Sequence, residues 1–124
     1  MIIGAAVVAV VLLAALAVLQ ALLAAGRPYG QLAWGGQHRV LPRRLRIGSA
    51  VSIALYAVIG WVLVAAAVEA PTAGRALEVG VWVLTGYFVL GVLVNAASRS
   101  RPERAVMTPV CLLLAGCCLV VALA

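Results

Sequence analysis

The chain contains no lysine and no aspartate, and only 10% of its 124 residues are charged. A soluble domain carries roughly a quarter charged residues, so this composition argues against a domain covered by water. Hydrophobic residues instead make up 67% of the chain. We therefore expect lipid to cover most of its surface. The absence of lysine beside abundant Ala, Val, Leu, Gly and Arg is typical of a GC-rich bacterial genome. Together with the apolar composition, this predicts a multi-pass protein of the bacterial plasma membrane.

Motifs for catalysis and cofactor binding are also missing. Cys111, Cys117 and Cys118 form no C-x-x-C pair, so a thioredoxin-like dithiol mechanism lacks its motif. His38 is the only histidine, and no Cys motif or acidic cluster accompanies it as a metal or heme site would require. No G-x-G-x-x-G or G-K-[ST] fingerprint for nucleotides occurs. We expect no enzymatic activity, no metal and no cofactor.

Long uncharged apolar runs dominate the chain. Each is about 20 residues or longer, which is enough for a helix to cross the ~30 Å hydrocarbon core. We predict a single all-α domain, residues 1–124, that folds as a polytopic transmembrane four-helix bundle. The predicted spans are about residues 2–26, 46–68, 76–98 and 103–124, and the loops are residues 27–45, 69–75 and 99–102.

The arginines are distributed unevenly among the loops, and this predicts the orientation. Short arginine-rich loops stay on the cytoplasmic side, so loops 27–45 and 99–102 are expected inside, and loop 69–75 and both termini outside (N-out/C-out). The same distribution argues against a nucleic-acid partner. Charged residues around the first loop are Arg27, Arg39, Arg43, Arg44 and Arg46; around the second, Glu69, Arg75 and Glu78; around the third, Arg99, Arg101, Glu103 and Arg104.

The first loop is the candidate site for an anionic ligand. Adjacent glycines beside arginines can turn backbone N–H groups toward an anion, and the guanidinium groups can hold a phosphate or a phospholipid headgroup. A general contact between arginines and anionic phospholipids at the cytoplasmic face is the alternative. The candidate residues are Trp34, Gly35, Gly36, Arg39, Arg43, Arg44 and Arg46.

Polar side chains within the predicted spans form a second candidate site. At 1.5 Å per residue they lie roughly 5 to 18 Å from the cytoplasmic arginines, so a cytoplasm-facing polar pocket capped by the first loop is possible. Hydrogen bonding between helices is the alternative. No charge lies near the midplane, where ion and proton paths usually carry one. The candidate residues are Gln20, Ser49, Ser52, Tyr56, Asn95 and Thr108.

The start of the fourth span has the spacing of a capping box. Ser100 is expected to cap the helix, and the side chain of Glu103 to reach back to the Ser100 amide. Pro102 fits the first turn, where no amide partner is lost.

The stretches Gly35–Ser49 and Asn95–Pro109 resemble segments of an actinobacterial-like family of small four-span bacterial membrane proteins to which no activity is assigned. The resemblance covers the two arginine-rich loops and their flanking helix ends, and it implies the four-span fold alone. Small multidrug exporters and small fluoride channels are similar in size. The midspan glutamate of the former and the glycine-arginine opening motif of the latter are absent here.

Three functions remain open from the sequence. The first, which the lack of a catalytic set favours, is a non-catalytic accessory, scaffold or interaction subunit in a homo-oligomer or a larger membrane complex. The second is a small oligomeric transporter or channel with a polar cytoplasmic vestibule. The third is an anionic-lipid-binding protein that uses the first loop.

The orientation is tested with an impermeant thiol reagent added to intact cells. Thr72→Cys should react from outside, and Gln37→Cys should react only after the membrane is opened, because the two positions lie in loops on opposite sides. The unsubstituted chain measures the background from the three native cysteines. The reverse pattern would overturn the orientation.

Overall fold

The computed structural model describes residues 1–124 and contains four long α-helices and no strand. Each helix is long and apolar enough to cross a membrane. The prediction of an all-α chain with four membrane-length helices is therefore confirmed. The helices are α1 (Ile2–Ala24), α2 (Arg43–Glu69), α3 (Arg75–Ala96) and α4 (Arg101–Ala122).

The helix ends depart from the predicted spans by one turn or less, and local backbone geometry explains the departures. The first helix ends at Ala24 because Gly26 adopts a φ of +86°, which leaves the helical region. The second begins at Arg43, inside the predicted loop 27–45. Pro42 is its extended N-cap, and the Pro42 carbonyl accepts hydrogen bonds from the amides of Leu45 and Arg46.

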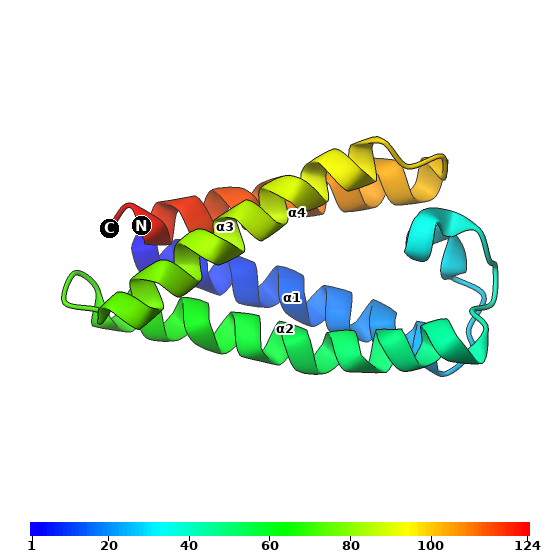
Figure 1. Cartoon of the computed structure of the whole chain (residues 1–124), viewed down its shortest axis with the longest axis horizontal. Coiled ribbons are helices and arrows are strands. Elements are labelled where there is room, and N and C mark those ends of the chain that lie inside the picture. The colour runs from blue at the N-terminus through cyan, green and yellow to red at the C-terminus, as the bar shows by residue number, and fades with distance from the viewer.

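The four helices form two antiparallel pairs. In one pair α1 packs along α2, and in the other α3 packs along α4 (Figure 1). The pairs meet near the termini and the 70–74 turn and diverge toward the other end of the bundle, where α2 and α3 have little contact (Figure 1). We call this other end, which holds every arginine except Arg75, the arginine-rich end.

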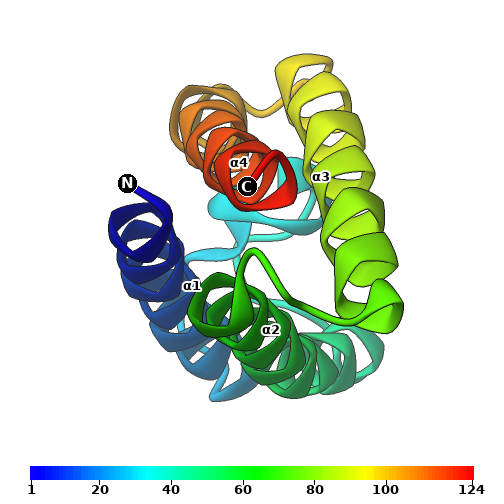
Figure 2. The ribbon, with the colours of Figure 1, turned by 90° about the vertical axis from the view of Figure 1, so that its left-hand side faces the viewer.

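The connection between α1 and α2, residues 25–42, folds into the space between the diverging pairs. It contains two short 3-10 helices, η1 (Gly30–Leu32) and η2 (Trp34–Gly36). Viewed along the bundle from the opposite end, this α1–α2 loop lies across the gap between the helices (Figure 2). The Gly30 amide donates to the Arg39 carbonyl at 2.9 Å, and Leu41 is buried, so the loop is folded on itself and against the bundle.

The core lies in the half of the bundle near the termini. Small residues of α1, Ala6 and Ala9, allow the neighbouring helices to approach closely. In a membrane, where lipid tails are as apolar as the side chains, packing contacts rather than escape from water would hold such a core together. The other fully enclosed residues include Leu13, Ile59, Leu63, Val81, Phe88, Leu114 and Cys118.

Trp34 anchors the α1–α2 loop to α2. Its indole Nε1 donates to the Ser49 hydroxyl at 3.1 Å, and Ser49 is fully buried. The ring lies directly on Gly48: a Cβ at that position would be 2.8 Å from Cη2 of Trp34. A glycine in the first turns of α2 therefore provides the space in which the loop docks.

Gly48→Ala should lower the melting temperature of the purified protein and move Trp34 off α2. Overpacking costs about 1–3 kcal/mol, which exceeds the gain of about 0.5–1 kcal/mol from alanine in a helix. Gly86→Ala is the matched control, because no atom lies within 4 Å of the added Cβ. Equal melting temperatures for the two variants would contradict the docked position of Trp34.

Candidate functional site

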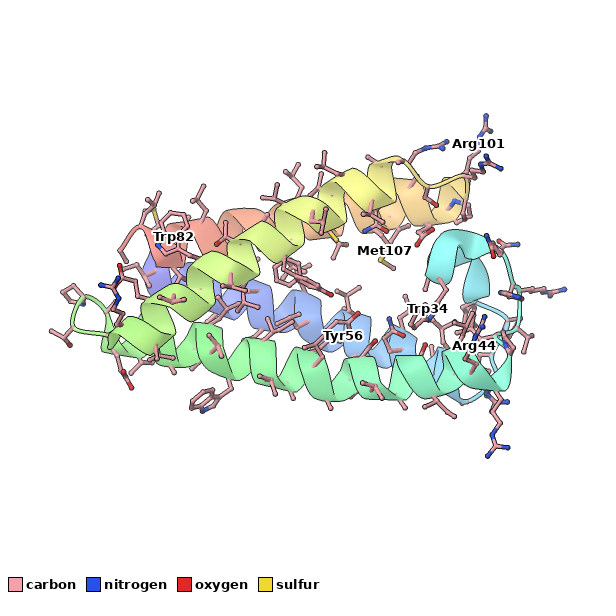
Figure 3. The ribbon with its side chains drawn as sticks, in the orientation of Figure 1. Trp34, Arg44, Tyr56, Trp82, Arg101 and Met107 are labelled. Carbon is pink, nitrogen blue, oxygen red and sulfur yellow. The ribbon has the colours of Figure 1, made fainter.

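A cavity of about 350 Å³ lies between the two helix pairs, toward the arginine-rich end. Trp34, Tyr56 and Met107 gather around this space, whereas Trp82 lies at the other end of the bundle and Arg101 points away from it (Figure 3). Most of the wall is apolar. The lining residues come from α1, α2, α3, α4 and the α1–α2 loop, and they include Leu16, Gln20, Leu32, Trp34, Tyr56, Tyr87, Phe88, Asn95, Glu103, Met107 and Cys111.

Gln20 and Tyr56 form the polar contact between α1 and α2 in this cavity. The Gln20 amide Nε2 donates to the Tyr56 hydroxyl at 3.2 Å. Gln20 is only 8% exposed, and its Oε1 has no hydrogen-bond partner. A buried acceptor without a partner costs about 1–3 kcal/mol, so a small movement that gives this amide oxygen a donor would be favourable.

Asn95 joins the α3 and α4 sides of the cavity. Its Nδ2 donates to the Gly91 carbonyl one turn earlier at 2.8 Å and to Cys111 Sγ at 3.4 Å. The helices approach closely here, since a Cβ on Gly91 would lie 3.2 Å from Cys111 Sγ. Asn95 therefore links two helices as well as lining the wall.

Glu103 closes the cavity at the arginine-rich end. The residue is 7% exposed; its carboxylate accepts hydrogen bonds from the Ser98 hydroxyl and, at 3.4 Å, from the Gly35 amide of the α1–α2 loop. The predicted capping box forms only in part. The Ser100 hydroxyl accepts from the Glu103 amide as expected, but the Ser100 amide donates to the Ser98 hydroxyl, because the carboxylate is turned toward the loop.

The predicted polar residues divide into three groups. Gln20, Tyr56 and Asn95 meet in the cavity. Ser49 is buried beneath Trp34, outside the cavity lining. Neither of the other two lines the cavity: the Ser52 hydroxyl donates to the Gly48 carbonyl of its own helix at 3.0 Å, and the Thr108 hydroxyl is buried without a partner.

Sequence reasoning missed Glu103 and Trp34 as cavity residues. Glu103 was expected to serve its own helix end, and Trp34 to belong to the anionic-ligand site of the first loop. The run of small residues around Gly48 carries no signal for the docking of Trp34, because the two are brought together only by the path of the loop.

The predicted anion-binding residues do not form one site. The Gly35 amide is occupied by Glu103, and Trp34 faces α2. The Arg46 Nε donates to the Ala24 carbonyl at the end of α1 at 2.9 Å.

A surface groove of about 410 Å³ lies where α1 ends and α2 begins. Arg43 and Arg46 flank it, and Ala24, Ile47 and Ala50 complete its lining. Arg39 and Arg44 are exposed and lie outside this groove, as do Trp34, Gly35 and Gly36. The glycines of the first loop therefore lie against the start of α4, whereas Arg43 and Arg46 lie at the groove between α1 and α2.

Comparisons with known protein families, curated proteins and solved structures find no match for this chain. The chemistry of the cavity is therefore the basis for a functional argument. The cavity has an apolar wall, aromatic rings and hydrogen-bond acceptors, and these are the groups with which proteins bind small organic molecules.

Ser100→Ala should loosen the α1–α2 loop. The Ser100 hydroxyl donates to the Gln31 carbonyl at 2.6 Å as well as capping α4, so the change removes a link between loop and helix and about 1 kcal/mol of capping. Hydrogen exchange at the amides of Gly30, Ala33 and Gly36 should become faster. Ser52→Ala, which removes a hydroxyl bonded within its own helix, should leave these amides protected. Unchanged exchange in Ser100→Ala would show that the loop is held elsewhere.

Proposed function

We propose that this protein binds a small, largely apolar molecule carrying a polar group in the cavity between its helix pairs. Ligand sites are typically concave and apolar with a few convergent polar groups, and this cavity has that character. The observation that carries the proposal is the cavity itself, in which a mostly apolar wall contains the polar side chains of Gln20, Tyr56 and Asn95 from three different helices.

We further propose that the arginine-rich end faces the cytoplasm of a bacterial cell and that both termini face outward. The support is the positive-inside rule applied to the two short loops at this end. The cavity would then belong to the cytoplasmic half of the membrane, with the α1–α2 loop as its lid. Ligand would enter past that loop or through the gap between α2 and α3, which have little contact there.

Transport would require movement of one helix pair against the other. The cavity reaches Phe88, which is 3% exposed, and beyond it Leu63 and Leu114 are completely buried. A continuous channel is therefore closed within a single chain. The sparse contact between α2 and α3 supports rocking of the pairs, so a carrier with a cytoplasmic vestibule is the form of transport compatible with this packing.

Anionic phospholipids are the proposed partners at the arginine-rich end. The groove flanked by Arg43 and Arg46 has an apolar floor of Ala24, Ile47 and Ala50. A phospholipid matches this arrangement, because its phosphate pairs with guanidinium groups and its acyl chain lies against apolar side chains.

A second candidate function is that of an interaction subunit. A groove of about 500 Å³ runs between α1 and α2 on their outer face and is lined by small residues that include Ala14, Ala17, Ala57 and Gly60. Small residues allow another transmembrane helix to approach closely. Trp61 borders the groove and is 67% exposed, so it would cover a helix docked there.

Native mass spectrometry of the tagged protein, extracted gently from its host, distinguishes the two functions. We expect the chain to retain a small molecule of constant mass, and Asn95→Leu to reduce its occupancy by about tenfold or more, since burial of an unmatched polar group on the ligand costs a few kcal/mol. Thr85→Val is the control on the same helix, because the Thr85 hydroxyl bonds to the Val81 carbonyl and does not line the cavity.

The same spectra contain the outcomes that count against the proposal. A stoichiometric protein partner with no small molecule would favour the interaction subunit. A retained mass unaffected by Asn95→Leu would place the ligand outside the cavity.

A further inference from the structure

We infer that the molecule bound in the cavity is an organic cation, such as an ammonium group on an apolar body. The inference rests on the proposed function, since it assigns a charge to the ligand of the same cavity. It is carried by Glu103, by the aromatic rings in the same lining, and by the exclusion of every arginine from that lining.

Glu103 gives the cavity a negative charge without a positive neighbour. Its carboxylate has two protein partners, the Ser98 hydroxyl and the Gly35 amide, and both are neutral donors. An ionised carboxylate accepts about four hydrogen bonds, so these two donors leave part of its acceptor capacity unused. The positive end of the α4 dipole favours a negative charge in the first turn, where Glu103 lies.

The basic residues lie elsewhere, although the chain carries nine of them. No arginine, lysine or histidine lines the cavity. Arg104, one residue after Glu103, donates to the Ser98 carbonyl at 3.0 Å, and Arg46 donates to the Ala24 carbonyl. An anion in this cavity would face a carboxylate with no cation to balance it, whereas a cation would complete an ion pair.

Aromatic rings supply the second element of cation recognition. Trp34 is on the loop side of the lining, Tyr56 on α2, and Tyr87 and Phe88 on α3. The rings of Tyr87 and Phe88 pack edge to face with centroids 5.1 Å apart. The face of an aromatic ring attracts an ammonium group.

The unpaired Oε1 of Gln20 completes the set. An amide oxygen carries partial negative charge and accepts a hydrogen bond from an ammonium N–H. Gln20 and Glu103 both line the cavity, and their atoms without a full set of protein partners, the Gln20 oxygen and the Glu103 carboxylate, are acceptors. Acceptors suit a cation and disfavour an anion.

The test compares three probes that share a benzyl group and differ in charge. Benzylammonium, which carries three N–H donors, is the cation, N-benzylacetamide the neutral probe and phenylmethanesulfonate the anion. Binding is measured by equilibrium dialysis against the full chain in phosphatidylcholine nanodiscs, with empty nanodiscs subtracted. We expect the cation to bind about tenfold more tightly than the neutral probe and the anion not to bind, because the ion pair and the ring contacts act only on the cation.

Glu103→Gln should remove the preference for the cation while leaving the neutral probe bound, because glutamine retains an acceptor for the loop amide. Glu69→Gln is the matched control: Glu69 is exposed at the other end of the bundle and outside the cavity lining. Equal binding of cation and neutral probe, or a preference that survives Glu103→Gln, would overturn the inference and leave the proposed function standing. Failure of all three probes to bind also overturns it. The proposed function is then tested separately by native mass spectrometry, which shows whether the chain retains a small molecule whose occupancy falls in Asn95→Leu.

Discussion

The docking of the α1–α2 loop onto α4 determines the form of the arginine-rich half of the molecule. Ser100 and Glu103 at the start of α4 bond to Gln31 and Gly35 of the loop, and on its other side Trp34 bonds to α2. The loop thus connects the two helix pairs at the end where they diverge. The direct contacts between the pairs, chiefly of α1 with α4, join them where they meet near the termini (Figure 1).

The two halves of the bundle differ in how tightly their helices pack. Near the termini, Ala9, Leu63 and Leu114 have no exposed surface, and the pairs interlock. Toward the arginine-rich end, bulkier and polar residues such as Tyr56 and Tyr87 stand around a cavity instead. Closely packed interiors resist deformation, so any change of shape is expected in the hollow half, with the packed half as its pivot.

The sequence was sufficient for the helices and insufficient for the site. Apolar length is a local property, and in hydrocarbon the backbone must satisfy its hydrogen bonds within each segment, so four helices followed from four runs. Gln20, Tyr56 and Asn95 were also identified, because polar residues inside a span stand out. Glu103 and Trp34 were misjudged because each had a plausible local role, Glu103 in capping its helix and Trp34 in the anionic-ligand site of its loop. Glu103 bonds to Gly35 of the loop and Trp34 to Ser49 of α2. The path of the loop brings these residues together, and sequence spacing does not predict that path.

Arg46 has two roles, a hydrogen bond to the end of α1 and a positive charge beside the first loop. Its guanidinium closes the carbonyl end of α1 and lies beside Gly26, whose positive φ turns the chain out of that helix. It is also one of the charges that set the balance between the loops. Arg44 contributes to that balance alone, because it is exposed, donates no side-chain hydrogen bond within the protein and lies outside the groove that Arg43 flanks. The charge at position 44 could therefore be moved to a neighbouring exposed position without loss of a contact, whereas moving the charge at position 46 would also open the end of the preceding helix.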